Sequence, residues 1–197
     1  TTWMPGYKEL SVGNHLFMTI QWMLSSFANE GKAFFIAIWA AGFLLLMKSE
    51  KAKVYQILAV VFSVAAILSY AGISFFSEMG IGDIDIEQCL MELPTWQSMT
   101  TPNRIAFFWW IAAVLFTLVL LWKVTGHSVF ISMVFLGGIA SEAVLHFSPT
   151  IYASGARVYY LTDLMYLFII LWMVMHMDSE KKKNLFIAGV VVLGVAN

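Results

Sequence analysis

Charged side chains are scarce in this chain. Asp, Glu, Lys and Arg make up only 12% of its 197 residues, whereas 60% of the residues are hydrophobic. A soluble domain usually carries about 25% charged and 45–50% apolar residues. Because one buried core cannot hold this excess of apolar side chains, the composition predicts a protein solvated by lipid. The lipid bilayer is the first partner that we expect, and no basic stripe indicates nucleic acid.

Cysteine and catalytic motifs are scarce as well. Cys89 is the only cysteine, which excludes an intrachain disulfide. No CxxC pair, Walker loop, GxGxxG or serine-nucleophile motif occurs, and the four histidines lack metal-ligand spacing. Asp83 and Asp85 could offer oxygen ligands to a divalent cation, but solvated acidic loops are common. We therefore predict no metal site, and the sequence identifies no cofactor.

Long apolar runs are abundant, and they predict an all-α fold. We expect a polytopic transmembrane bundle of five full spans and a truncated sixth, at about 33–47, 54–76, 105–122, 128–147, 158–175 and 185–197. Residues 15–28 carry apolar side chains at helical spacing, interrupted by polar ones, which predicts an amphipathic interfacial helix. A core helix is the alternative. We treat 1–197 as a single transmembrane domain. Because the sequence ends within an apolar run, we expect a fragment of a larger protein.

Lysines are unevenly distributed among the connections. The segments 48–53, 123–127 and 176–184 contain seven lysines, whereas the opposite-side segments contain four basic residues. Cytoplasmic loops retain Lys and Arg, so these three segments are predicted to be cytoplasmic and the acidic loop 77–104 external. Tryptophans near the predicted span ends are expected to lie at the membrane interfaces: Trp109, Trp110, Trp122 and Trp172.

Two acidic residues interrupt the predicted spans. Glu142 lies in the fourth span and Asp163 in the fifth, both toward the external end. Ionisable groups in membrane helices are costly, and they often mark functional sites. His146 shares a helix face with Glu142, and Tyr159 shares one with Asp163. Small residues at 137, 138 and 141 predict a face that another helix can approach closely.

Arg157 ends the short loop that joins these two spans. An arginine at a helix N-terminus offers a planar fork of donors beside free backbone N–H groups, a combination that suits a phosphate. The alternatives are that Arg157 pairs with Glu142 or Asp163, or that it anchors the helix at the lipid headgroups. In the same way, the two acids could serve only to satisfy the loop backbone.

The segment 147–160, with Thr162 and Asp163 after it, resembles a motif of a bacterial family of uncharacterised multi-spanning proteins related to GT-C membrane glycosyltransferases. The resemblance implies an enzyme of the bacterial cytoplasmic membrane, active in cell-envelope glycan modification. Such an enzyme transfers a sugar from a polyprenyl-phosphate carrier at the external face. The predicted lipid-phosphate or substrate-binding residues are Arg157, Glu142, Asp163, Tyr152 and His146. The catalytic acid of that superfamily precedes this fragment, so the catalytic residues stay unknown.

Two other functions fit the same residues. In a transporter or flippase subunit, Glu142 and Asp163 would bind a coupling ion or a substrate. In a non-catalytic membrane scaffold, all polar residues would serve packing. Tolerance of substitutions at Arg157, Glu142 and Asp163 would distinguish the scaffold from the other two.

Overall fold

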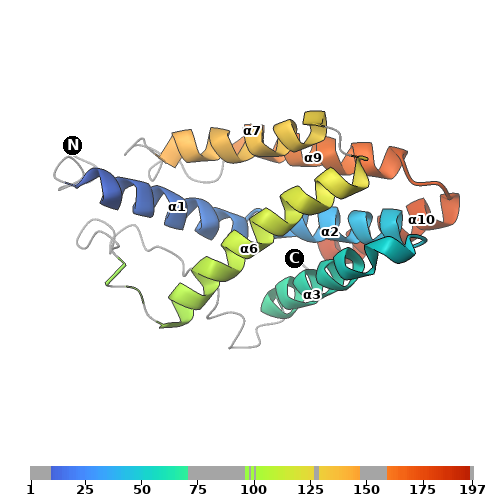
Figure 1. Cartoon of the computed structure of the whole chain (residues 1–197), viewed down its shortest axis with the longest axis horizontal. Coiled ribbons are helices and arrows are strands. Elements are labelled where there is room, and N and C mark those ends of the chain that lie inside the picture. Colours follow the sequence, from blue (N-terminus) through green and yellow to red (C-terminus); the bar gives the residue numbers. More distant parts are fainter. Residues whose placement is uncertain are drawn as a thin grey trace.

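The described part of the chain is built from helices (Figure 1). A computed structural model describes residues 10–70, 96, 97, 99, 101–126, 129–146 and 159–195. Within these residues there is no β-strand, which confirms the all-α prediction. The elements are α1 (Val12–Asn29), α2 (Lys32–Leu46), the 3-10 helix η2 (Glu50–Ala52), α3 (Lys53–Tyr70), α6 (Thr101–Val124), α7 (Val129–His146), α9 (Tyr160–Met175) and α10 (Glu180–Val195).

A helix occupies each apolar run of the sequence, with shifts at some ends. The largest shift among the helix starts is in α10, which begins at Glu180 rather than near residue 185. The Ser179 carbonyl accepts hydrogen bonds from the backbone N–H groups of Lys182 and Lys183, at 3.0 and 3.2 Å. Lys183 also pairs with Glu180 at 2.8 Å. The predicted lysine loop therefore forms the first turn of a helix.

Only some of the described helices are long and apolar enough to cross a membrane. Glu50–Leu68 and Arg104–Val124 meet that criterion alone. Val12–Ala28 and Lys32–Leu46 meet it as a pair that is bent by 69°. The apolar helices Val129–Leu145 and Tyr160–Met175 are shorter. The described residues thus contain two candidate spans, or three if the bent pair is one broken span.

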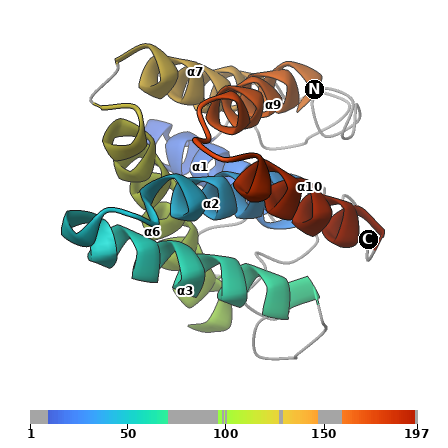
Figure 2. The ribbon, with the colours of Figure 1, turned by 90° about the vertical axis from the view of Figure 1, so that its right-hand side faces the viewer.

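Helix α2 lies at the centre of the fold. It packs against α3, α6, α9 and α10, which surround it in Figure 2. The ring of Phe35 in α2 is fully buried and contacts rings from other helices: Phe27, Trp110, Phe135 and Tyr166. Many large apolar side chains of α3 and α10, by contrast, are exposed. A helix in lipid is expected to carry apolar side chains both on the face that packs in the bundle and on the face that points away from it.

The lysine-containing connections lie at one end of the long axis. Figure 1 shows the α2–α3 connection, the C-terminal end of α6 and the α9–α10 connection at this end. The C-terminal end of α7 and the N-terminal end of α9 lie toward the other end. This is the arrangement expected if the three segments 48–53, 123–127 and 176–184 share one side of a membrane.

Helix α1 is packed into the bundle. Its side chains from Met18 onward include buried apolar residues, and Phe27 is 1% exposed. Ser11 caps its first turn, since the Asn14 N–H donates to the Ser11 hydroxyl at 3.2 Å. Burial of this helix favours the core-helix alternative over an amphipathic helix that lies on a membrane face.

Candidate functional site

Close packing of α7 on α9 positions the two acids identified in the sequence. A Cβ atom at Gly138 would lie 3.1 Å from Cε1 of Tyr166, so a larger residue would require the tyrosine ring to move by a few tenths of an ångström. The Thr162 hydroxyl donates a hydrogen bond to the Gly138 carbonyl at 3.3 Å. The predicted small-residue face therefore does bring another helix close. Glu142 lies one turn beyond Gly138, and Asp163 follows Thr162.

Glu142 is a buried acid. Its side chain is 1% exposed, and the Ser26 hydroxyl of α1 bonds to its carboxyl group. The second carboxyl oxygen, Oε1, has no hydrogen-bond partner among the described residues. Buried polar atoms are nearly always paired, so this oxygen requires an explanation.

Two further carboxylates lie close enough to Glu142 to interact with it electrostatically. They are the half-buried Asp163 of α9 and the exposed Glu30, which follows α1. We call Glu30, Glu142 and Asp163 the carboxylate cluster. Tyr166, 1% exposed, lies near both Glu142 and Asp163. Its hydroxyl likewise has no hydrogen-bond partner among the residues that the structure describes.

The cluster adjoins the break between α1 and α2. Helix α1 ends at Asn29 and α2 begins at Lys32, with a bend of 69° between them. The N–H groups of Glu30 and Gly31 both donate to the Ser26 carbonyl, at 2.9 and 3.0 Å. In membrane proteins, broken helices are tolerated where they line a cavity or a binding site. The break and the buried acid thus lie together.

The structure groups some of the predicted site residues and leaves others undescribed. Glu142 and Asp163 lie close enough to interact electrostatically. The side chain of His146, and the whole of Tyr152 and Arg157, lie outside the described residues, as does the acidic loop with Asp83 and Asp85. Contacts of Arg157 with a phosphate or with the acids stay predictions. Among the described residues, no group of three or more His, Cys, Asp or Glu side chains could hold a metal ion.

Three participants were not predicted from the sequence. Tyr166 lies among apolar residues and looks like an ordinary core aromatic. Ser26 and Glu30 are four residues apart, so they share one helix face. That spacing was the available signal, but it does not show that α7 packs against this face.

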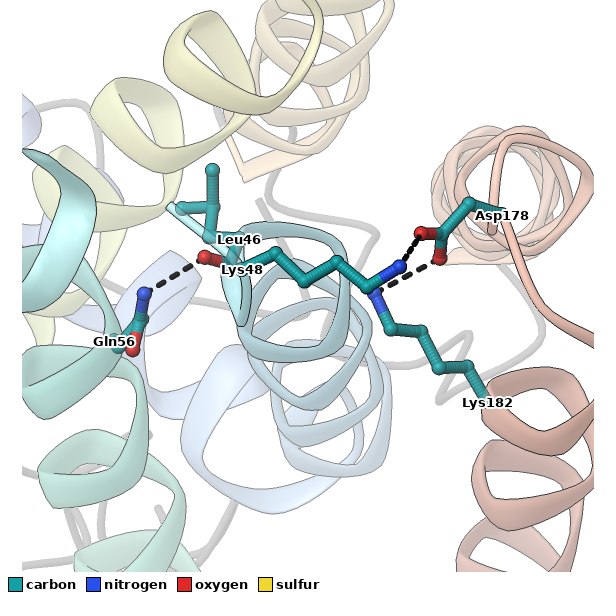
Figure 3. Close-up of polar contacts among 5 residues, drawn as sticks. All are labelled: Leu46, Lys48, Gln56, Asp178 and Lys182. Carbon is teal, nitrogen blue, oxygen red and sulfur yellow. Dashed lines mark hydrogen bonds and ion pairs between the residues drawn. The ribbon is translucent and has the colours of Figure 1, made fainter. Parts of the chain in front are cut away.

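A second polar group ties the lysine-rich end together (Figure 3). Asp178 accepts from Lys48 at 2.8 Å and from Lys182 at 2.9 Å. The hydrogen bonds from Lys48 and Lys182 lower the pKa of Asp178 to about 2, and the bond to Asp178 raises the pKa of Lys48. We call Lys48, Asp178 and Lys182 the lysine clamp. It joins the end of α2 to the α9–α10 connection.

The C-terminal end of α2 is also capped by Gln56 of α3. The Gln56 side-chain amide donates to the carbonyl of Leu46 at 2.7 Å and to that of Ser49 at 3.1 Å. The last carbonyls of a helix lack intrahelical partners, so this amide replaces the missing donors. The clamp and the cap together fix the α2–α3 connection.

Comparison of the chain with models of known protein families, with curated proteins and with solved structures finds no match. A function therefore has to be argued from the residues and their geometry.

Proposed function

We propose that the chain is part of a multi-spanning membrane protein, with the lysine clamp on the cytoplasmic side. Helices α1 and α2 would together cross the bilayer as one broken span, α3, α6, α7 and α9 would each cross it, and α10 would begin a further span. At 1.5 Å per residue, α7 and α9 reach about 27 and 24 Å, slightly less than a hydrocarbon core of about 30 Å. Local thinning of the bilayer accommodates such a difference. The outward-facing apolar side chains of α3 and α10 support this arrangement.

We propose further that the protein works as an ion-coupled transporter or flippase subunit. The buried carboxyl of Glu142, with one oxygen unpartnered among the described residues, carries this proposal. A carboxylate held away from water has to be neutralised by a proton or a bound cation. Since Glu142 contacts α1 and lies on α7 beside α9, a change in its charge would alter the packing of three helices. Such a change is a means of coupling ion binding to helix movement.

Charge displacement in reconstituted liposomes tests this function. The full-length protein is adsorbed on a solid-supported membrane, and currents are recorded after a pH jump and after a sodium jump. We expect transient currents with the wild type and none with Glu142→Gln. Glu180→Gln, which removes an exposed carboxylate at the other end of the fold, is the matched control and should keep the currents. Equal currents in Glu142→Gln and the wild type would contradict the proposal.

Sugar transfer from a polyprenyl-phosphate carrier stays a prediction. Its expected phosphate ligand, Arg157, lies outside the described residues, whereas the described geometry gathers three carboxylates that would repel a phosphate. Transfer of a labelled sugar by the full-length protein, and its loss in Arg157→Ala, would favour the enzyme over the transporter.

A further inference from the structure

Oxygen atoms surround the break between α1 and α2. Glu142 Oε1 and the Tyr166 hydroxyl have no hydrogen-bond partner among the described residues, and the Ser26 hydroxyl already contacts Glu142. The carbonyl groups of residues 27–30 belong to the last turn of α1, where carbonyls lack intrahelical partners. Carboxylate, hydroxyl and carbonyl oxygens are the ligands of hard cations.

The charged side chains at the break leave a net negative sum. The partial negative charge at the end of α1 is opposed by the partial positive charge at the start of α2. Glu30, Glu142 and Asp163 can carry three negative charges, whereas Lys32, the first residue of α2, carries one positive charge. A single cation bound at Glu142 would remove the buried charge.

The oxygen atoms available at the break are mostly uncharged, which favours a monovalent cation. The described residues contain no group of three His, Cys, Asp or Glu side chains suited to a metal ion, so carbonyls and hydroxyls would have to complete the coordination shell. Broken membrane helices bind sodium in this way, through unwound carbonyls and the C-terminal ends of half-helices.

We propose that Glu142 binds sodium at the α1–α2 break, and that sodium is the coupling ion, a role that rests on the transport function proposed above. Glu142 supplies the charged ligand. Ser26, Tyr166 and the carbonyls at the end of α1 supply neutral oxygens. Glu30 and Asp163 attract the cation from the more exposed side of the site.

Thermal stability of the detergent-solubilised full-length protein tests the site. Tm is measured in sodium, potassium and choline chloride at one ionic strength. A ligand that binds only the folded state stabilises it, so saturating sodium should raise Tm by roughly 5 °C relative to choline. We expect no sodium-specific rise in Glu142→Gln, and an unchanged rise in the control Glu180→Gln.

If Glu142→Gln folds poorly, variants of Ser26 still test the sodium site. Ser26→Ala should weaken the apparent sodium affinity roughly tenfold, the size expected for one lost ligand contact, whereas Ser26→Thr should restore it. Binding of radioactive sodium to the purified protein gives the same comparison without a melting transition.

Each result has a defined meaning. Equal Tm in sodium and choline, or the same sodium shift in Glu142→Gln, overturns the sodium site. If that failure comes with pH-jump currents that Glu142→Gln abolishes, the transport function stands with the proton as its ion. A sodium shift that depends on Glu142, without currents, supports the site and overturns the coupling role.

Discussion

Buried polar groups in this fold differ in whether their hydrogen bonds are complete. The Trp39 indole N–H donates to the Thr117 hydroxyl at 2.8 Å, and that hydroxyl donates to the Ala113 carbonyl at 2.7 Å. These groups satisfy one another, so their role is packing. Glu142 Oε1 and the Tyr166 hydroxyl have no such partners among the described residues. The contrast separates Trp39 and Thr117, whose hydrogen bonds are complete, from Glu142 and Tyr166, whose hydrogen bonds are incomplete among the described residues.

Gly138 offers a test of the packing that positions the cluster. Gly138→Ala places a Cβ atom 3.1 Å from Cε1 of the buried Tyr166. The tyrosine ring has to shift, and inserting an atom into a well-packed core typically destabilises by about 1–3 kcal/mol. We expect Gly138→Ala to lower Tm in detergent.

Gly137→Ala is the matched control for this substitution. Its Cβ atom would meet Met165 at 3.7 Å, an ordinary contact. Alanine is also the better helix former by about 0.5–1 kcal/mol, so Tm should stay the same or rise. Equal losses of Tm in both variants would show that the approach of Tyr166 to Gly138 is not what requires glycine.

Part of the site could be predicted from single residues. Glu142 and Asp163 stand out because charged side chains are rare within apolar runs. Ser26 could not be assigned to Glu142, since no sequence pattern tells which face of α1 meets α7. Trp110 illustrates the same limit. Its position near a span end predicted an interfacial residue, but it is 4% exposed and contacts Phe35 edge to face.

At the scale of elements, hydropathy located the helices well and their ends less well. Apolar runs mark segments that lipid or a core can solvate, and a helix lies in each of them. Helix α10 begins earlier than its apolar run because the N–H groups of Lys182 and Lys183 bond to the Ser179 carbonyl, so that the lysines form its first turn. The 69° bend between α1 and α2 was not predicted, because Gly31 between them is compatible with a loop, a kink or a broken span.

The lysine clamp should make the stability of the fold depend on pH, because its ion pairs require an ionised Asp178. The pKa of Asp178 is about 2 in the fold, below the value of about 3.9 for a free aspartate. Stabilisation by the clamp is therefore complete above about pH 4 and is lost as pH falls toward about 2. Asp178→Asn removes this dependence and leaves Lys182, whose side chain is 8% exposed, without that carboxylate.

We expect Asp178→Asn to have a lower Tm than the wild type at pH 7, and the difference to shrink at pH 3. Glu180→Gln is the control, because it removes only the exposed pair with Lys183. Melting curves of both variants in detergent at the two pH values provide the measurement. A wild-type Tm that falls between pH 7 and pH 3 no more than that of Asp178→Asn would argue against the clamp.

At the scale of the whole molecule, charged side chains lie at both ends of α2 and of α9. Helix α2 begins at Lys32, beside Glu30, and ends just before Lys48 of the clamp. Helix α9 carries Asp163 in its first turn and ends just before Asp178. Tyr166, Ile169 and Met173 bury α9 against the core between these two groups. A shift of α9 relative to α2 would therefore change the distances between charged groups in both the carboxylate cluster and the lysine clamp.

The proposed orientation in the membrane can be tested with cysteines placed at both ends of the fold. Cys89 is the only cysteine, so Cys89→Ala provides a background without thiols. Ser49→Cys, Thr125→Cys and Ser179→Cys mark the three connections at the lysine end without removing a lysine. Thr101→Cys marks the exposed start of α6 at the other end. A membrane-impermeant maleimide is then applied to intact cells and to permeabilised cells.

Because lysine-rich segments are retained in the cytoplasm, we expect Thr101→Cys to react in intact cells and the other three to react only after permeabilisation. The three results have to agree, since an even number of crossings separates the connections in the proposed topology. Suppose Thr125→Cys reacts in intact cells while Ser49→Cys and Ser179→Cys do not. Then one of α3 and α6, and one of α7 and α9, does not cross the membrane. Glu142 stays buried in the bundle, but α7 and α9 would not be two neighbouring spans, and the transport function proposed for them would be contradicted.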